Sequence, residues 1–275
     1  MLNIFRNKPT PSEQLPTDRP KEVKQILDEQ VEASLKEFNK SNQGLLISAF
    51  SAGLEVGFSL LLMGTIFTLF ADQMSTETLR LSLALCYPIG FIFVIIGRSE
   101  LFTEHTALAI LPVLKGSVKV KELLILWALV YIGNLLGGYV FSLLIVSIGP
   151  DVGFLSLDSL HHFAEELTHH QWHTILISAL LAGWMMGLLG WLVTSSQETI
   201  SRIFVVILVT AIIGMAGLHH CIVGSIEVFS GMITSEDITL MHYLKFQLWA
   251  TLGNVIGGAV FVALLKYSHV RFADG

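Results

Sequence analysis

The residues best suited to chemistry in this sequence lie in two short polar stretches, each of which interrupts a strongly apolar segment. The stretches read GRSELFTEH at 97–105 and GLHH at 217–220, and an acidic residue follows the second on the same helical face. Their ionisable and hydroxyl side chains are Arg98, Glu100, Thr103, Glu104, His105, His219, His220 and Glu227. Because such side chains are costly in apolar surroundings, we expect them to face an internal cavity and to serve function.

His220 is the strongest candidate for contact with a substrate. An imidazole titrates near physiological pH and can donate a hydrogen bond to an anion or pass a proton to it. The hydroxyl of Thr103 can donate to a substrate or to His220. The structural alternative is a histidine that only caps the carbonyls of a broken helix, in which case it would not meet substrate.

The other residues of the two stretches fall into two groups, those that could narrow the pore and those that could hold the loops in place. Leu101 and Phe102 could form a hydrophobic ring that removes water from a permeating solute, or could simply pack against helices or lipid. Glu100 and His219 complete the expected pore set. We expect the remaining residues, with Glu55 of the first apolar segment, to support the loops, the charged ones as buried ion partners: Gly97, Arg98, Glu104, Gly217 and Glu227.

The composition is that of a membrane protein. Of 275 residues, 53% are hydrophobic and only 14% are charged, against roughly 25% charged in soluble domains. The formal net charge is -6 and no long basic run occurs, so the sequence offers no electrostatic footprint for nucleic acid. The first twenty residues lack a continuous apolar region of the kind found in cleavable signal peptides.

Six apolar stretches predict membrane-spanning helices, at about 44–71, 81–97, 122–149, 171–194, 203–218 and 246–266. The second and fifth stretches are short. Each is followed by a glycine-marked polar break and a further apolar segment, at 97–114 and 217–233. The sequence therefore predicts two interrupted helices, a feature that marks transport sites in membrane proteins.

An internal repeat relates the two halves of the chain. The segment IGNLLGGYVFSLL at 132–144 returns 120 residues later as LGNVIGGAVFVAL at 252–264, and AGLEVG at 52–57 returns 130 residues later as AGWMMG at 182–187. The first offset aligns Gly97 with Gly217 and Glu100 with His220. Units of three spans must run in opposite directions, so we expect an all-α, inverted 3+3 repeat of about 44–149 and 171–266, whose glycine faces let helices pack closely.

The chain begins with a segment outside this repeat. We expect residues 1–43 to form a cytoplasmic N-terminal segment and 44–270 to form the transmembrane channel domain. Apolar residues at helical spacing within 21–40 predict an amphipathic helix, packed on the membrane domain, lying at the lipid interface or gating a pore.

Basic residues predict the orientation. With six spans both termini share a side, which would carry thirteen of the sixteen Lys and Arg residues. Arg98 lies in the first break, and only Arg80 and Lys245 fall on the other side. The positive-inside rule therefore predicts cytoplasmic termini.

In these motifs the chain resembles the formate/nitrite transporter family, and within it a less characterised, YfdC-like branch. GRSELFT at 97–103 is similar to that family's first-break loop, GLHHCI at 217–222 to its second break with the pore histidine at His220, and the two GN..GG segments to its third and sixth helices. The resemblance implies an aquaporin-like fold, a homopentamer in a bacterial inner membrane, a Leu101 and Phe102 constriction with Thr103 facing His220, and transport of small monovalent anions.

The chain also departs from that family's pattern. His219 stands where the family usually has an acidic residue, Gly183 precedes Trp184 where it has asparagine, and Leu167 stands where many members have a vestibule lysine. Loss of that cation and that amide bears directly on which anion is selected.

Three functions are consistent with the sequence. The first is a channel for small weak-acid anions of the formate or nitrite kind, with or without a coupled proton. The second is a channel for a neutral solute such as water or ammonia. The third, a metal-dependent membrane enzyme, has no nucleophile and base pair or cofactor motif behind it, and the histidines of the loop 149–171 lack the partner spacing of a metal site. We expect no cofactor, no bound metal and no enzymatic activity.

Overall fold

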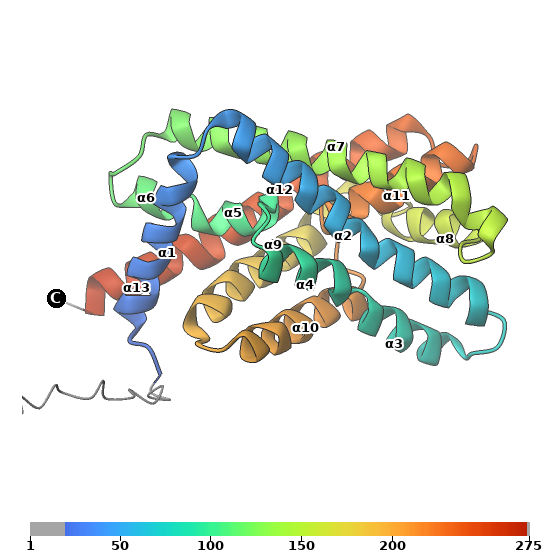
Figure 1. Cartoon of the computed structure of the whole chain (residues 1–275), viewed down its shortest axis with the longest axis horizontal. Helices are drawn as coiled ribbons and strands as arrows, with labels where there is room; N and C mark the ends of the chain where they lie inside the picture. Colours follow the sequence, from blue (N-terminus) through green and yellow to red (C-terminus); the bar gives the residue numbers. More distant parts are fainter. Residues whose placement is uncertain (1–19, 274–275) are drawn as a thin grey trace, which may run out of the picture.

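The computed structural model describes residues 20–273 and is helical throughout its regular structure (Figure 1). Of the predicted N-terminal segment 1–43, residues 1–19 lie outside the described residues. The elements are α1 Val23–Phe38, α2 Asn42–Phe70, α3 Thr76–Cys86, α4 Pro88–Gly97, α5 Phe102–Leu108, α6 Leu111–Leu114, α7 Val120–Val152, α8 Leu157–Thr168, α9 Trp172–Ser195, α10 Thr199–Ala216, α11 Val223–Thr234, α12 Leu240–Gly258, a π-helix Ala259–Leu264 and α13 Leu265–Ala273.

Six helical segments in the described part of the chain are long and apolar enough to cross a membrane, which confirms the predicted number of spans. They are Asn42–Phe70, Thr76–Gly97, Val120–Val152, Trp172–Ser195, Thr199–Ala216 and Leu240–Phe272. The last span is longer at both ends than the sequence predicts, because α12, the π-helix and α13 continue one another. The protein is therefore a multi-pass membrane protein.

Local sequence explains where several helices begin. Ser41, Ser75 and Ser156 precede α2, α3 and α8, and each side chain accepts a hydrogen bond from a backbone N–H in the first turn of its helix. Pro88 opens α4, where its missing N–H has no helical partner to lose. The span Thr76–Gly97 therefore consists of two helices that meet at Tyr87.

Both predicted interruptions are present. Helix α4 ends at Gly97 and α5 begins at Phe102, while α10 ends at Ala216 and α11 begins at Val223. The short apolar helices Phe102–Leu114 and Val223–Thr234 follow the two breaks. We name residues 98–101 the first break loop and residues 217–222 the second break loop.

Glycine faces pair the long helices of each half. In the first half, a Cβ on Gly137 of α7 would lie 2.1 Å from the carbonyl oxygen of Phe50 in α2. In the second half, a Cβ on Gly257 of α12 would lie 2.2 Å from the carbonyl oxygen of Leu180 in α9. The same contact therefore recurs at offsets of 120 and 130 residues, which supports the predicted inverted repeat.

Helix α1 lies across one end of the bundle together with α6 and α13, whereas α8 lies at the other end (Figure 1). We name these the α1 end and the α8 end. The buried apolar residues of α1 are Ile26, Leu27 and Val31, which pack in a small cluster with Leu111 of α6 and Trp191 of α9. The described part of the amphipathic segment is thus packed on the membrane domain.

Candidate functional site

The two break loops leave their helices by the same backbone turn. Arg98 has φ 61° and ψ 39°, and Gly217 has φ 61° and ψ 37°, so both residues are left-handed. The next N–H in each loop closes the turn, from Ser99 to the Val94 carbonyl at 3.1 Å and from Leu218 to the Ile213 carbonyl at 3.0 Å. Gly97 therefore ends its helix but does not occupy the left-handed position that Gly217 does.

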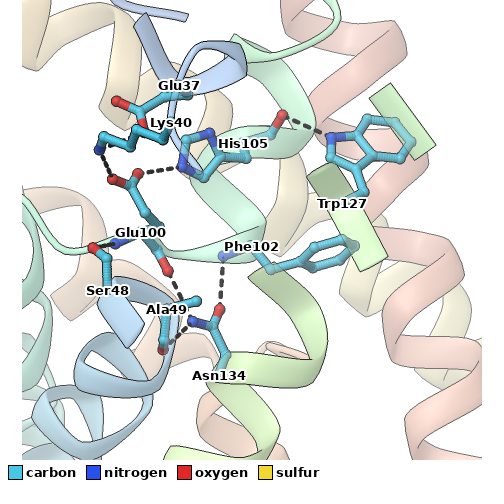
Figure 2. Close-up of polar contacts among 9 residues, drawn as sticks. All are labelled: Glu37, Lys40, Ser48, Ala49, Glu100, Phe102, His105, Trp127 and Asn134. Carbon is cyan, nitrogen blue, oxygen red and sulfur yellow. Dashed lines mark hydrogen bonds and ion pairs between the residues drawn. The ribbon is translucent and has the colours of Figure 1, made fainter. Parts of the chain in front are cut away.

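Two buried asparagines hold the loops. The Asn134 side chain accepts from the Phe102 N–H at 2.8 Å and donates to the carbonyls of Ala49 and Glu100, both at 2.8 Å (Figure 2). Asn254 repeats this arrangement on the second break loop, as it accepts from the Cys221 N–H at 2.8 Å and donates to the carbonyls of Ala179 and His219. Both are the asparagines of the repeated GN..GG segments.

These hydrogen bonds correct the predicted alignment of the loops by one residue. Because Asn134 holds the Glu100 carbonyl and Asn254 holds the His219 carbonyl, Glu100 corresponds to His219. A serine confirms this register, since Ser48 accepts from the Glu100 N–H and Ser178 accepts from the His219 N–H. The expected pairing of Glu100 with His220 is wrong, and the counterpart of His220 is Leu101.

The structure brings His220 and Thr103 together from the two halves. The Nε2 atom of His220 lies 2.9 Å from the Thr103 hydroxyl, and both residues are buried. The Nδ1 atom accepts from the backbone N–H groups of Ile222 and Val223, at 3.3 and 3.2 Å. An Nδ1 that accepts from two donors carries no proton, so the neutral imidazole has its proton on Nε2, donates to Thr103 and leaves the Thr103 hydroxyl proton free to donate onward.

A cavity of about 740 Å³ leads to His220 from the α8 end. We name it the vestibule. Its walls come from α2, α3, α8, α10 and α11 and from the residues that connect these helices, and its lining includes Tyr87, Glu166, His170 and Glu227. Leu101 and Thr103 beyond it are fully buried, so in this structure water does not reach them.

One aromatic ring, that of Phe91, packs against the His220 imidazole, whereas the expected constriction residue Phe102 packs elsewhere. Phe91 of α4 meets the His220 ring edge to face at 5.2 Å, and the Tyr87 ring lies tilted against Phe91 at 5.3 Å. The Phe102 ring instead contacts Tyr131 and Trp127 of α7, so it packs between helices. Phe91 and Tyr87 were not predicted as site residues, because both belong to apolar sequence with no charged neighbour to single them out.

A charged cluster holds the first break loop on its α1 side (Figure 2). The Glu100 carboxylate is ion-paired with Lys40 of the α1–α2 connection and with His105, whose Nε2 lies 2.7 Å from it. Lys40 is also 2.6 Å from Glu37 at the end of α1. Burial, together with the adjacent Glu100 carboxylate, raises the pKa of Glu37. Lys40 and Glu37 were not predicted, because only the fold brings α1 to this loop.

Both ring nitrogens of His219 have hydrogen-bond partners in the protein. Its Nδ1 lies 2.8 Å from the Ser178 hydroxyl and its Nε2 lies 3.2 Å from the Leu167 carbonyl. It does not line the vestibule among the described residues. His219 therefore ties the second break loop to α9 and α8 rather than facing a solute.

The expected ion pairs at the remaining charges are absent from the described part of the chain. Arg98 is exposed, and Glu104 and Glu227 form no ion pair there. Glu55 accepts from the Ser51 hydroxyl at 2.8 Å and also has no ion pair. Within residues 20–273 these four residues therefore do not hold the loops as ion partners, whereas Glu100 does.

The histidines of the α8 end stand close to one another without forming a metal centre. The rings of His169 and His170 are 3.9 Å apart. Partial burial, with His169 as a neighbour, lowers the pKa of His170. Between residues 20 and 273 no group of three or more His, Cys, Asp or Glu side chains is placed to hold a metal ion.

Known proteins are similar to this chain in sequence and in fold. The chain is 30% identical to the inner membrane protein YfdC of Escherichia coli K12 over 86% of this chain and 75% of that protein. It is 27% identical to the nitrite transporter NirC of the same organism, over 80% and 81% of the two chains, and 25% identical to its formate channel FocA, over 66% and 70%.

Two solved structures share the fold at 24% identity. An FNT family ion channel aligns with a TM-score of 0.80 over 90% of this chain and 99% of that one, and a pentameric formate channel with formate bound aligns with a TM-score of 0.70 over 87% and 98%. The profile described as formate/nitrite transporter matches residues 24–268. With the profile covering most of the sequence, the chain belongs to the formate/nitrite transporter family.

Proposed function

We propose that this protein conducts a small monovalent weak-acid anion, of the formate or nitrite kind, between the vestibule and the α1 end. The observation that carries the proposal is the 2.9 Å contact of Thr103 with His220 where the vestibule ends. Family membership and the names of the formate and nitrite relatives support the same substrate class. The Thr103 hydroxyl is the group that meets the solute, and His220 holds it in place.

The chemistry of the step follows from the apolar surroundings. A bare anion loses many kcal/mol of hydration in hydrocarbon, whereas a neutral acid that forms a hydrogen bond with Thr103 costs little more than any small polar solute. We infer that the anion crosses the buried region largely with a proton bound. Nδ1 of His220 already accepts hydrogen bonds from two N–H groups, so we do not assign the proton to His220. The pH dependence of influx tests whether the proton comes from the medium.

The test is a substrate panel in proteoliposomes of the purified full chain. Influx of formate, nitrite, acetate and hydrosulfide is measured between pH 5 and 8 for the wild type and His220→Ala. We expect selective anion influx that rises as the pH falls and that His220→Ala reduces by at least tenfold, an effect of about 1.4 kcal/mol. Anion influx that is unchanged by His220→Ala and by pH would overturn the proposal.

A neutral solute is the second candidate, because a neutral imidazole suits a neutral permeant. The position of the family's vestibule lysine is Leu167 here, and Arg80 is the one Lys or Arg that lines the vestibule among the described residues. Stopped-flow light scattering of the same vesicles separates the two. Water or ammonia permeability that depends on His220, with no anion influx, would favour this alternative.

The metal-dependent enzyme remains a third outcome. Metal analysis of the purified protein tests it directly. A stoichiometric ion that His220→Ala removes would favour it over a channel.

The proposal includes the number of chains in the assembly and the orientation of each chain in the membrane. We propose a homopentamer with one pathway in each protomer, in a bacterial inner membrane with cytoplasmic termini. Lys40 and Lys115 lie at the α1 end, whereas Arg80 and Lys245 lie at the α8 end, which supports a cytoplasmic α1 end. Native mass spectrometry should give five chains. A Lys36→Cys substitution, made where Cys86 and Cys221 are both replaced by serine, should react only from the cytoplasmic side.

A further inference from the structure

Glu227 is a buried carboxylate that faces the vestibule without a protein partner. It lines the cavity on the same face of the chain as His220 and Gly224. The residue is 7% exposed, and within residues 20–273 it forms no hydrogen bond and no ion pair. Removing an unpaired carboxylate from bulk water is costly, so packing alone does not explain its position.

Glu227 lies between His220 and the mouth of the vestibule. Helix α11 runs from the second break loop towards the α8 end, where it packs against α8. A solute that enters from the α8 end therefore passes Glu227 before it reaches His220 and Thr103.

The other charged groups of the vestibule do not neutralise Glu227. Arg80 is exposed, and its Nε donates to the Met215 carbonyl at 2.9 Å. From α8, Glu166 adds a second carboxylate, which is exposed to solvent at the mouth. The helices α2, α7 and α12, which also pack on α11, contribute no charged side chain to the cavity lining in the described chain.

The remaining titratable groups of the cavity are one phenol and four imidazoles. The Tyr87 hydroxyl comes from the junction of α3 and α4, and it has no hydrogen-bond partner within residues 20–273. The imidazoles on the cavity wall are His162, His169, His170 and His220. None of these four forms an ion pair with Glu227.

We propose that Glu227 is a specificity-determining residue of the vestibule, which repels monovalent anions when it is ionised and admits them when it is protonated. The protonated carboxyl is uncharged and can donate a hydrogen bond to a passing anion. The ionised carboxylate, in a narrow cavity of low dielectric, opposes the approach of a second negative charge. Acidic medium on the α8 side thus favours anion entry. This inference rests on the proposed function.

The test compares charge-altering variants in proteoliposomes of the full chain. Formate influx is measured from pH 5 to 8 for the wild type, Glu227→Gln, Glu227→Asp and Glu166→Gln. Glu227→Gln is a neutral isostere, so we expect its influx at pH 8 to exceed that of the wild type by about tenfold and its pH profile to flatten. Glu227→Asp should keep the pH profile, and Glu166→Gln, at the solvated mouth, should change influx by less than about twofold.

Two readouts keep the result interpretable. Thermal unfolding and elution volume establish that each variant is folded, and water permeability of the same vesicles should be unaffected by Glu227→Gln because the charge does not act on a neutral solute. A folded Glu227→Gln protein with the wild-type pH profile would overturn this inference and leave anion transport intact. A wild type without influx of formate or nitrite at any pH would overturn both.

Discussion

Asn134 and Asn254 carry much of the energetics of the site at the scale of single residues. Each side chain bonds one N–H and one carbonyl at its helix break and one carbonyl of the neighbouring α2 or α9, and both residues are fully buried. At membrane depth no water replaces a lost partner, so each unsatisfied group is expensive. The stability of the break loops therefore depends on the hydrogen bonds of these two side-chain amides.

Replacing either asparagine by alanine should destabilise the protein. Each variant leaves two buried backbone groups of its break without this partner, at about 1–3 kcal/mol for each group. The third partner, a carbonyl inside α2 or α9, keeps its helical hydrogen bond. We expect the midpoint of thermal unfolding in detergent to fall by roughly 5 °C or more and anion influx to be lost. Asn39→Ala is the matched control, because Asn39 is exposed and donates only to the Leu35 carbonyl. Wild-type unfolding midpoints for Asn134→Ala and Asn254→Ala would contradict this account.

At the scale of elements, close helix packing sets the positions of the two loops. Helices α2 and α7 in one half, and α9 and α12 in the other, approach through glycines that admit backbone from the facing helix. The asparagines lie on α7 and α12, so any separation of these pairs moves the anchors of the loops. Packing far from the vestibule is thereby linked to the His220 and Thr103 contact.

Gly137→Ala and Gly257→Ala should both disturb this packing. The added Cβ would lie 2.1 or 2.2 Å from a backbone oxygen that cannot rotate away, and such overpacking costs about 1–3 kcal/mol. We expect lower unfolding midpoints and reduced influx for both. Gly190→Ala serves as the control, since the nearest atoms to its Cβ would be 4.0 Å away. If all three variants unfold alike, close packing does not set the loop positions.

Helix α1 is a second element that acts on the first break loop, through Glu37 and Lys40. The raised pKa of Glu37 means that the docked helix holds a proton more tightly than a released one. Docking is therefore favoured below the ordinary value of 4.5 and weakens as the pH rises from there through the raised pKa. This is the sign expected when two carboxyl groups, Glu37 and Glu100, share one lysine.

Hydrogen exchange of the α1 amides, corrected for intrinsic rates, measures this dependence. We expect protection of α1 to decrease between pH 5 and 8 in the wild type and to vary much less with pH in Glu37→Gln. Glu32→Gln is the control on the same helix, because Glu32 is exposed and pairs only with Lys36. Equal pH dependence in Glu37→Gln and the wild type would show that Glu37 does not govern docking.

At the scale of the whole molecule, the two halves share a backbone but differ in chemistry. Equivalent positions carry Glu100 in one loop and His219 in the other, and Leu101 opposite His220. The first loop faces α1 through an ion-paired cluster, and the second faces the vestibule through an imidazole. The two ends of the molecule therefore differ in chemistry although the two halves share one backbone arrangement.

The architecture could be predicted from the sequence because the repeated residues are the glycines and asparagines that determine the backbone packing. Gly137, Asn134 and their mates recur at one offset, and an odd number of spans then requires inversion. The side-chain partners could not be predicted. Glu100 meets Lys40 only after α1 folds back, and Arg98, which occupies the left-handed turn of its loop, is exposed rather than buried.

The register of the break loops was missed by one residue for a related reason. Equivalent residues of α7 and α12, such as Asn134 and Asn254, are 120 residues apart. Equivalent residues of the break loops are 119 apart, because the N–H groups of Phe102 and Cys221 bind these two asparagines. A difference of one residue in an irregular loop leaves no periodic signal.

The central claim is that the Thr103 hydroxyl, held by His220, carries the permeating anion through the buried region. Formate influx into proteoliposomes at pH 5 tests it with Thr103→Val, which keeps the shape and removes the hydroxyl, and Thr103→Ser, which keeps the hydroxyl. We predict that the valine variant loses at least tenfold in influx, equivalent to about 1.4 kcal/mol, while the serine variant stays within about twofold of the wild type. Equal influx through Thr103→Val and the wild type, with both proteins folded, would contradict the account.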